Sequence, residues 1–75
     1  MPSLRRDVEQ VLDTAKRLME ENPRLGACIA LYRAGNSSSS PRAAGLLDDL
    51  LPIDERFSTD TKTIDHLYSR PEVRG

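Results

Sequence analysis

The segment that most constrains the fold is residues 22–36, NPRLGACIALYRAGN, because as a helix it has apolar residues on every side. Asn22 is suited to cap this helix, Pro23 to occupy its first position, and Gly35-Asn36 to end it in a left-handed turn. A helix that is apolar all round is buried on more than one side. In a chain of 75 residues, this predicts cover by a second copy or by another protein. Its apolar residues are Leu25, Cys28, Ile29 and Tyr32 on one stripe, and Ala27, Ala30, Leu31 and Ala34 on the flanks.

Residues 3–22 carry the clearest helical pattern of the chain. Their apolar residues recur at the spacings of a single helical face: Leu4, Val8, Val11, Leu12, Ala15, Leu18 and Met19. Pro23 follows without a loop, and a residue before proline is biased away from helical geometry. The chain is therefore expected to turn sharply there, so that residues 1–36 form an antiparallel helical hairpin.

The second half predicts shorter helices behind a Ser-rich linker at residues 37–40. One amphipathic helix begins at Pro41, ends before Pro52 and carries four leucines; a weaker one begins at Ser58 or Thr59. These short helices occupy residues 41–68, and residues 69–75 are expected to be a flexible tail. No stretch alternates as a half-buried strand would. The predicted fold is all-α: a small helical hairpin or bundle of three to four helices, completed by dimerisation.

Chain length and the numbers of cysteine and histidine residues limit how so small a domain can be stabilised. A core of this size rarely supplies more than about 3–5 kcal/mol without a disulfide, a metal or an oligomeric contact. A single cysteine excludes an internal disulfide, and one histidine beside it disfavours a structural zinc site. The unpaired cysteine fits a reducing compartment, and no apolar run approaches the roughly 20 residues that span a bilayer. We therefore expect a cytoplasmic, soluble protein that has no membrane partner and oligomerises.

Residues that could carry chemistry are few. Cys28 and His66 lie on different predicted helices, and the acid pairs at residues 48–49 and 54–55 match no calcium-binding loop. No glycine-rich phosphate loop and no G-x-S-x-G turn is present. Gly26 and Gly45, isolated glycines in predicted helices, fit either close approach of another helix or simple tolerance. The sequence thus predicts no catalytic residue, no cofactor and no metal.

The function predicted from this pattern is a non-enzymatic protein–protein interaction module, a helical homodimer that acts as an adaptor or assembly factor. Residues 1–36 form its oligomerisation core. The helix of residues 41–51 either covers one end of the bundle or binds a protein partner through Leu46, Leu47, Leu50 and Leu51. The expected dimer interface consists of Leu4, Val8, Val11, Leu12, Ala15, Leu18, Met19, Leu25, Cys28, Ile29, Leu31 and Tyr32.

The alternative is a nucleic-acid-binding helical dimer that recognises the backbone of a duplex by shape. Its phosphate contacts would be Arg5, Arg6, Lys16, Arg17 and Arg24. In general layout, and in the short Arg-Arg-Asp run at residues 5–7, the chain resembles small viral suppressors of RNA silencing. Acidic residues interleave with these Arg and Lys residues, as on an ordinary solvated helix face: Glu9, Asp13 and Glu20.

Charge is uneven along the chain. Residues 1–42 have seven basic and five acidic residues, a net charge of +2, whereas residues 43–75 have four basic and seven acidic residues, a net charge of −3. Such asymmetry permits head-to-tail self-attraction.

Overall fold

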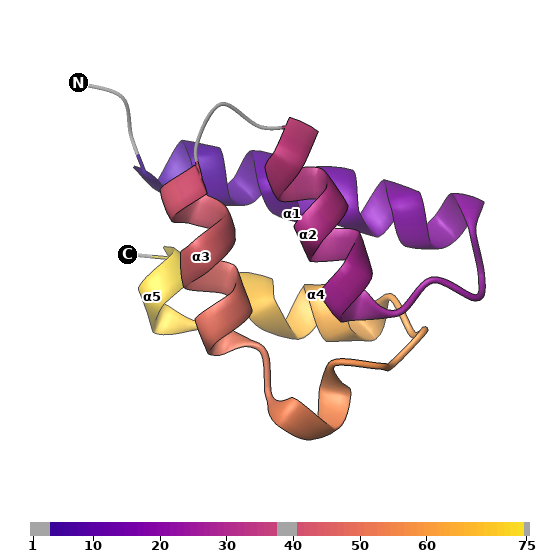
Figure 1. Cartoon of the computed structure of the whole chain (residues 1–75). Helices are drawn as coiled ribbons and strands as arrows, with labels where there is room; N and C mark the ends of the chain where they lie inside the picture. Colours follow the sequence, from indigo (N-terminus) through magenta and orange to yellow (C-terminus); the bar gives the residue numbers. More distant parts are fainter. Residues whose placement is uncertain (1–3, 38–40, 75) are drawn as a thin grey trace.

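The chain folds into helices joined by short turns, in a computed structural model that describes residues 4–37 and 41–74 (Figure 1). The elements are α1 (Leu4–Glu21), α2 (Ala27–Ser37), α3 (Pro41–Leu50), the 3-10 helix η1 (Ile53–Glu55), α4 (Lys62–Tyr68) and α5 (Pro71–Arg74). No strand occurs in the described residues, so the prediction of an all-α fold is confirmed.

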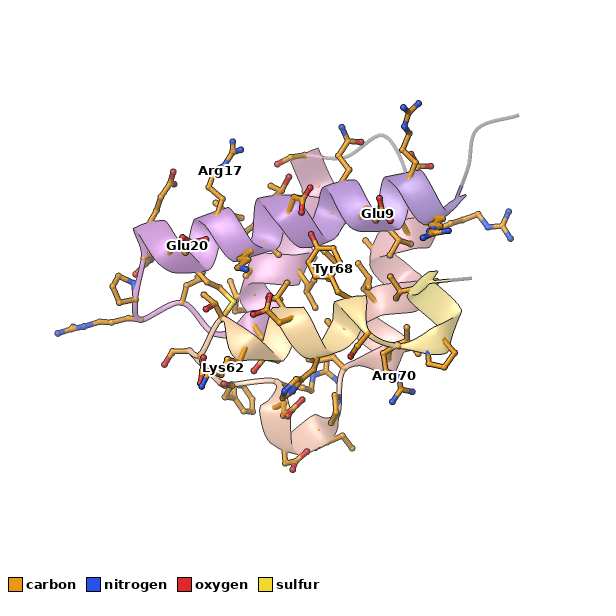
Figure 2. The ribbon with its side chains drawn as sticks, turned by 180° about the vertical axis from the view of Figure 1, so that it is seen from behind. Glu9, Arg17, Glu20, Lys62, Tyr68 and Arg70 are labelled. Atoms are coloured by element: carbon orange, nitrogen blue, oxygen red, sulfur yellow. The ribbon has the colours of Figure 1, made fainter. Side chains whose placement is uncertain are left out.

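Two layers of helices build the domain. Helix α1 and the α4–α5 segment lie in one layer, and α2 and α3 cross them in the other (Figures 1 and 2). Helix α1 packs against all four of the other α-helices, while α2 and α3 also pack against each other. The core therefore lies between α1 and the rest of the chain.

Helix α1 follows its sequence pattern closely. Its predicted apolar face is buried at Val8, Val11, Leu12, Ala15 and Met19. Leu18 is half-buried against the same core; the side chain of Leu4 lies outside the described part. The Asn22 amide donates to the Leu18 carbonyl over 3.0 Å and continues the helical bonding by one residue.

Residues 22–26 form a turn, which corrects the predicted start of the second helix. The Leu25 amide donates to the Asn22 carbonyl (3.0 Å), and the Arg24 amide donates to Asn22 Oδ1 (3.3 Å). Asn and Pro thus occupy the first two positions of a β-turn, where both are favoured, and Pro23 does not begin a helix. The break between the first two helices occurs as predicted, and α2 crosses α1 steeply in Figure 1.

The far end of α2 also differs from the prediction, because Gly35 and Asn36 remain helical and α2 ends at Ser37. The proposed linker of residues 37–40 consequently begins inside the helix, and its residues 38–40 lie outside the described part of the chain. Helix α3 occupies nearly its predicted range, with Ala43 and Leu47 buried.

The C-terminal third is more ordered in the structure than the sequence suggests. Helix α4 begins at Lys62, several residues later than predicted. Asp60 forms a turn before it, in which Asp60 Oδ1 accepts the Lys62 amide (2.9 Å) and the Asp60 carbonyl accepts the Thr63 amide (3.1 Å). Where a flexible tail is predicted from residue 69, residues 71–74 form α5, and Val73 is only 2 % exposed. A single buried valine in a short polar segment has no periodicity to reveal it.

The core closes within one chain. The radius of gyration of 11.0 Å matches the roughly 11 Å expected for a compact single domain of this length. The buried apolar residues come from every α-helix and from the segments beside them: Val8, Val11, Leu12, Ala15, Met19, Leu25, Ala27, Ala30, Leu31, Ala34, Ala43, Leu47, Leu51, Ile64, Leu67 and Val73.

Candidate binding groove between α2 and α3

Helix α2 buries a face of three alanines and one leucine and leaves two large apolar residues exposed. The buried face is Ala27, Ala30, Leu31 and Ala34, at i, i+3, i+4 and i+7 spacing. Alanine on this face permits the close packing that α2 needs against both α1 and α3. Two large members of the other stripe are consequently exposed, with Ile29 at 45 % and Tyr32 at 67 %.

A groove with a volume of about 560 Å³ opens between α2 and α3 beside these exposed residues. Its lining is mostly apolar: Cys28, Ile29, Leu31, Tyr32, Gly35 and Asn36 from α2, Pro41, Ala44, Gly45 and Asp48 from α3, and Arg56 from the following loop. Large exposed apolar side chains around a concave surface are typical of a binding site.

The two helices approach most closely at Gly35. A Cβ atom placed on Gly35 would lie only 2.5 Å from the Cβ of Ala44, so only glycine fits at this point. Gly45, one residue further along α3, has the opposite environment, because nothing lies within 4 Å of a Cβ placed there. Gly35 therefore permits the close approach of α2 and α3, whereas Gly45 leaves the backbone of α3 accessible at the groove.

Arg56 closes the end of the groove formed by the start of α2 and the end of α3. The loop that carries it also caps α2: the Ala27 amide donates to the Ser58 carbonyl (2.9 Å) and the Cys28 amide to the Arg56 carbonyl (2.9 Å). Arg56 Nη2 donates to Cys28 Sγ (3.5 Å) and to Asp48 Oδ1 (3.1 Å). The Cys28 contact first, and then the charge of Asp48, raise the pKa of the Arg56 guanidinium, which stays positively charged.

The residues predicted for the dimer interface are divided between core and groove. Within one chain the structure buries Val8, Val11, Leu12, Ala15, Met19, Leu25 and Leu31, and half-buries Leu18 and Cys28. The cover that the sequence assigned to a second copy is provided here by α3, α4 and α5. Among the members of the predicted interface whose side chains the structure describes, Ile29 and Tyr32 are the exposed ones, and both line the groove.

The leucines predicted to bind a partner are instead used within the chain. Leu47 and Leu51 are buried in the core, and Leu46 and Leu50 are half-buried against it. Of the two roles considered for this helix, the structure shows it covering the bundle. The surface that α3 presents to solvent is its opposite, polar side.

The basic residues proposed to contact nucleic acid do not gather around the groove. Arg5 pairs with Glu9 (3.4 Å), and Lys16 pairs with Asp65 of α4 (3.0 Å). The hydrogen bond to Asp65 raises the pKa of the Lys16 ammonium. Arg17 lies on α1 with Glu20 beyond it on the same helix (Figure 2). Arg6 and Arg24 are exposed.

A second polar contact joins the α1–α4 pair. The Tyr68 hydroxyl donates to Asp13 Oδ1, and Figure 2 shows the ring directed from α4 towards α1. Burial first, and then the hydrogen bond to Asp13 and the nearby acids, raise the pKa of Tyr68 above its usual range. Lys16 and Tyr68 thus hold α4 against α1, which is a structural role.

The residues considered for catalysis are not assembled into a site. His66 is exposed on α4, with Nδ1 3.8 Å from Glu55 Oε1, and does not line the groove that contains Cys28. Within the described ranges, no group of three or more His, Cys, Asp or Glu side chains could hold a metal ion. In residues 4–37 and 41–74, no helix has the length and hydropathy needed to cross a membrane.

Comparison of the chain with protein-family models, with curated proteins and with solved structures finds no match.

Proposed function

We propose that the chain is a non-enzymatic protein–protein interaction module that self-associates through the groove between α2 and α3. The observation that carries this proposal is the exposure of Ile29 and Tyr32 at the edge of the groove, while another, mostly alanine face of the same helix is buried. Removing such a surface from water is favourable by roughly 25 cal/mol per Å² of apolar area. A binding partner is the natural source of that cover.

Charge supports a second copy as the partner. The chain has a formal net charge of −1, so copies do not repel one another strongly. Its halves carry opposite charge, +2 over residues 1–42 and −3 over residues 43–75. The groove lies between α2, from the first half, and α3, most of which belongs to the second.

Tyr32→Glu is expected to abolish self-association without unfolding the chain. The substitution removes an exposed ring and places a charge at the groove, where a partner would have to desolvate it. Sedimentation equilibrium over micromolar to millimolar concentrations should show a monomer–dimer equilibrium for the wild type and a monomer for the variant. Circular dichroism should show the same helix content for both.

Gln10→Glu is the matched control, because it adds the same charge at an exposed position of α1. This control should dimerise as the wild type does. A wild-type chain that remains monomeric at every concentration would refute the proposal. Binding to a short generic RNA or DNA duplex at low salt, lost as salt rises, would support the nucleic-acid alternative in its place.

A further inference from the structure

The solvent-facing side of α3 carries a basic residue, a glycine and an acidic residue in one row. Arg42, Gly45 and Asp49 are all exposed, at i, i+3 and i+7 spacing, which places them on one helical face. Gly45 lies between the two charges and also lines the groove. The row therefore borders the surface proposed above for self-association.

The two charges are placed against the intrinsic preference of a helix. Acidic residues stabilise the first turn of a helix and basic residues the last, because of the helix dipole. Helix α3 has no acidic residue in its first turn and no basic residue in its last. Instead, Arg42 lies in the first turn and Asp49 in the last.

Neither charge is compensated within the part of the chain that the structure describes. Asp48, beside Asp49, pairs with Arg56, whereas no ion pair involves Arg42 or Asp49. Arg42 and Asp49 are seven positions apart, about 10 Å along the helix axis, which is too far for them to pair with each other. A second molecule could therefore supply the opposite charge for both Arg42 and Asp49.

We propose that two copies associate about a twofold axis near Gly45, with their α3 helices antiparallel. Arg42 then lies opposite Asp49 of the partner subunit, and Asp49 lies opposite Arg42 of the partner subunit. This inference rests on the proposed function and specifies its partner and geometry. An antiparallel arrangement also opposes the two helix dipoles, so the charges that are unfavourable within one helix become favourable between two.

Gly45 suits the crossing point because it is open to solvent and has no Cβ. Nothing lies within 4 Å of a Cβ placed there, so the glycine is not required by packing within the chain. At a crossing of two helices, a missing side chain lets the backbones approach closely. The position midway between the two charges is the one where a twofold axis would have to pass.

The contact must extend beyond α3 to be stable. A dimer interface of standard size buries roughly 800 Å² of each partner, about a sixth of the 5119 Å² exposed here. A helix of 10 residues is only about 15 Å long and cannot supply that area alone. The partner must therefore also cover Ile29 and Tyr32 at the edge of the groove.

Charge reversal tests this geometry. Arg42→Asp places acids opposite acids at both contacts of a homodimer, and Asp49→Arg places bases opposite bases, so each variant should raise the dimer Kd about tenfold or more. An equimolar mixture should form a heterodimer with both contacts restored, with a Kd within about threefold of the wild type. Sedimentation equilibrium measures the Kd of each variant and of their mixture. Both substitutions place a charge that the α3 dipole favours, so the fold is retained.

Arg17→Asp and Glu20→Arg on α1 are the matched controls. They change the net charge by the same amounts at exposed positions, so they reveal any effect of overall charge alone. Both control variants should dimerise with the wild-type Kd, and mixing them should not lower that Kd. A wild-type dimer that is indifferent to reversal at residues 42 and 49, or reversed variants that do not combine, would overturn the geometry and leave self-association intact. A wild type that never dimerises would overturn both proposals.

Discussion

Leu47→Ala is expected to lower the free energy of unfolding by about 2–5 kcal/mol, which is the usual cost of truncating a fully buried leucine. Leu47 is 0 % exposed and lies in the core between α3 and the rest of the chain. A domain this small has a total stability of about 5 kcal/mol or little more. Urea denaturation followed by circular dichroism should therefore show a variant that is largely unfolded or close to it.

The outcome decides between two roles for α3. If the helix were a detachable segment waiting for a partner, truncating its leucine would leave the stability of the remaining chain unchanged. Arg42→Ala provides the comparison, because it shortens an exposed residue of the same helix and should change stability by no more than about 0.5 kcal/mol. Equal stability of the two variants would contradict the core position of Leu47.

Gly35→Ala and Gly45→Ala are expected to change stability in opposite directions. At Gly35 the new methyl group would meet the Cβ of Ala44 at 2.5 Å, and because that atom is fixed to the backbone, α2 and α3 would have to separate. Such overpacking typically costs about 1–3 kcal/mol. At Gly45 the methyl group meets nothing, so the better helix propensity of alanine should stabilise the monomer by about 0.5–1 kcal/mol.

Thermal unfolding at low concentration, where association does not contribute, measures both effects. The two variants are one another's control, because each exchanges a helical glycine for alanine and the propensity gain is common to both. If Gly35→Ala were as stable as Gly45→Ala, then the close approach of α2 and α3 at Ala44 would not exist.

Where the apolar pattern has a single solution, the sequence predicts the fold well. Helix α1 has one apolar stripe and a polar remainder, so its buried face and its range follow directly from periodicity. Helix α3 is bounded by Pro41 and Pro52, and its range is predicted to within a residue. Predicting the ranges of these two helices required no knowledge of what packs against them.

Helix α2 shows where such prediction ends. It has two apolar stripes, and hydrophobicity alone favours burying the one with Ile29 and Tyr32. The structure buries the alanine stripe instead, because α2 lies against both α1 and α3 and the space there suits small side chains. The i, i+3, i+4, i+7 spacing of Ala27, Ala30, Leu31 and Ala34 was the available signal. Choosing between the stripes requires the tertiary arrangement.

The groove was partly visible in the sequence. Cys28, Ile29 and Tyr32 belong to the predicted dimer interface, and Gly45 fitted close approach of another helix as one of two explanations. Arg56 could not have been found, because its position depends on a loop that folds back to cap α2. The burial of Val73 is equally non-local, since α5 is held by its packing on α1 and α4.

The central claim is that the chain folds alone and associates afterwards through an outer surface. Helix content and molar mass measured on the same dilution series test this most directly, by circular dichroism and light scattering. We expect the mass to fall from two chains to one on dilution while the helical signal per residue stays constant. If helix content and mass fell together, the core would be shared between copies, and the account of a chain that closes its own core would be wrong.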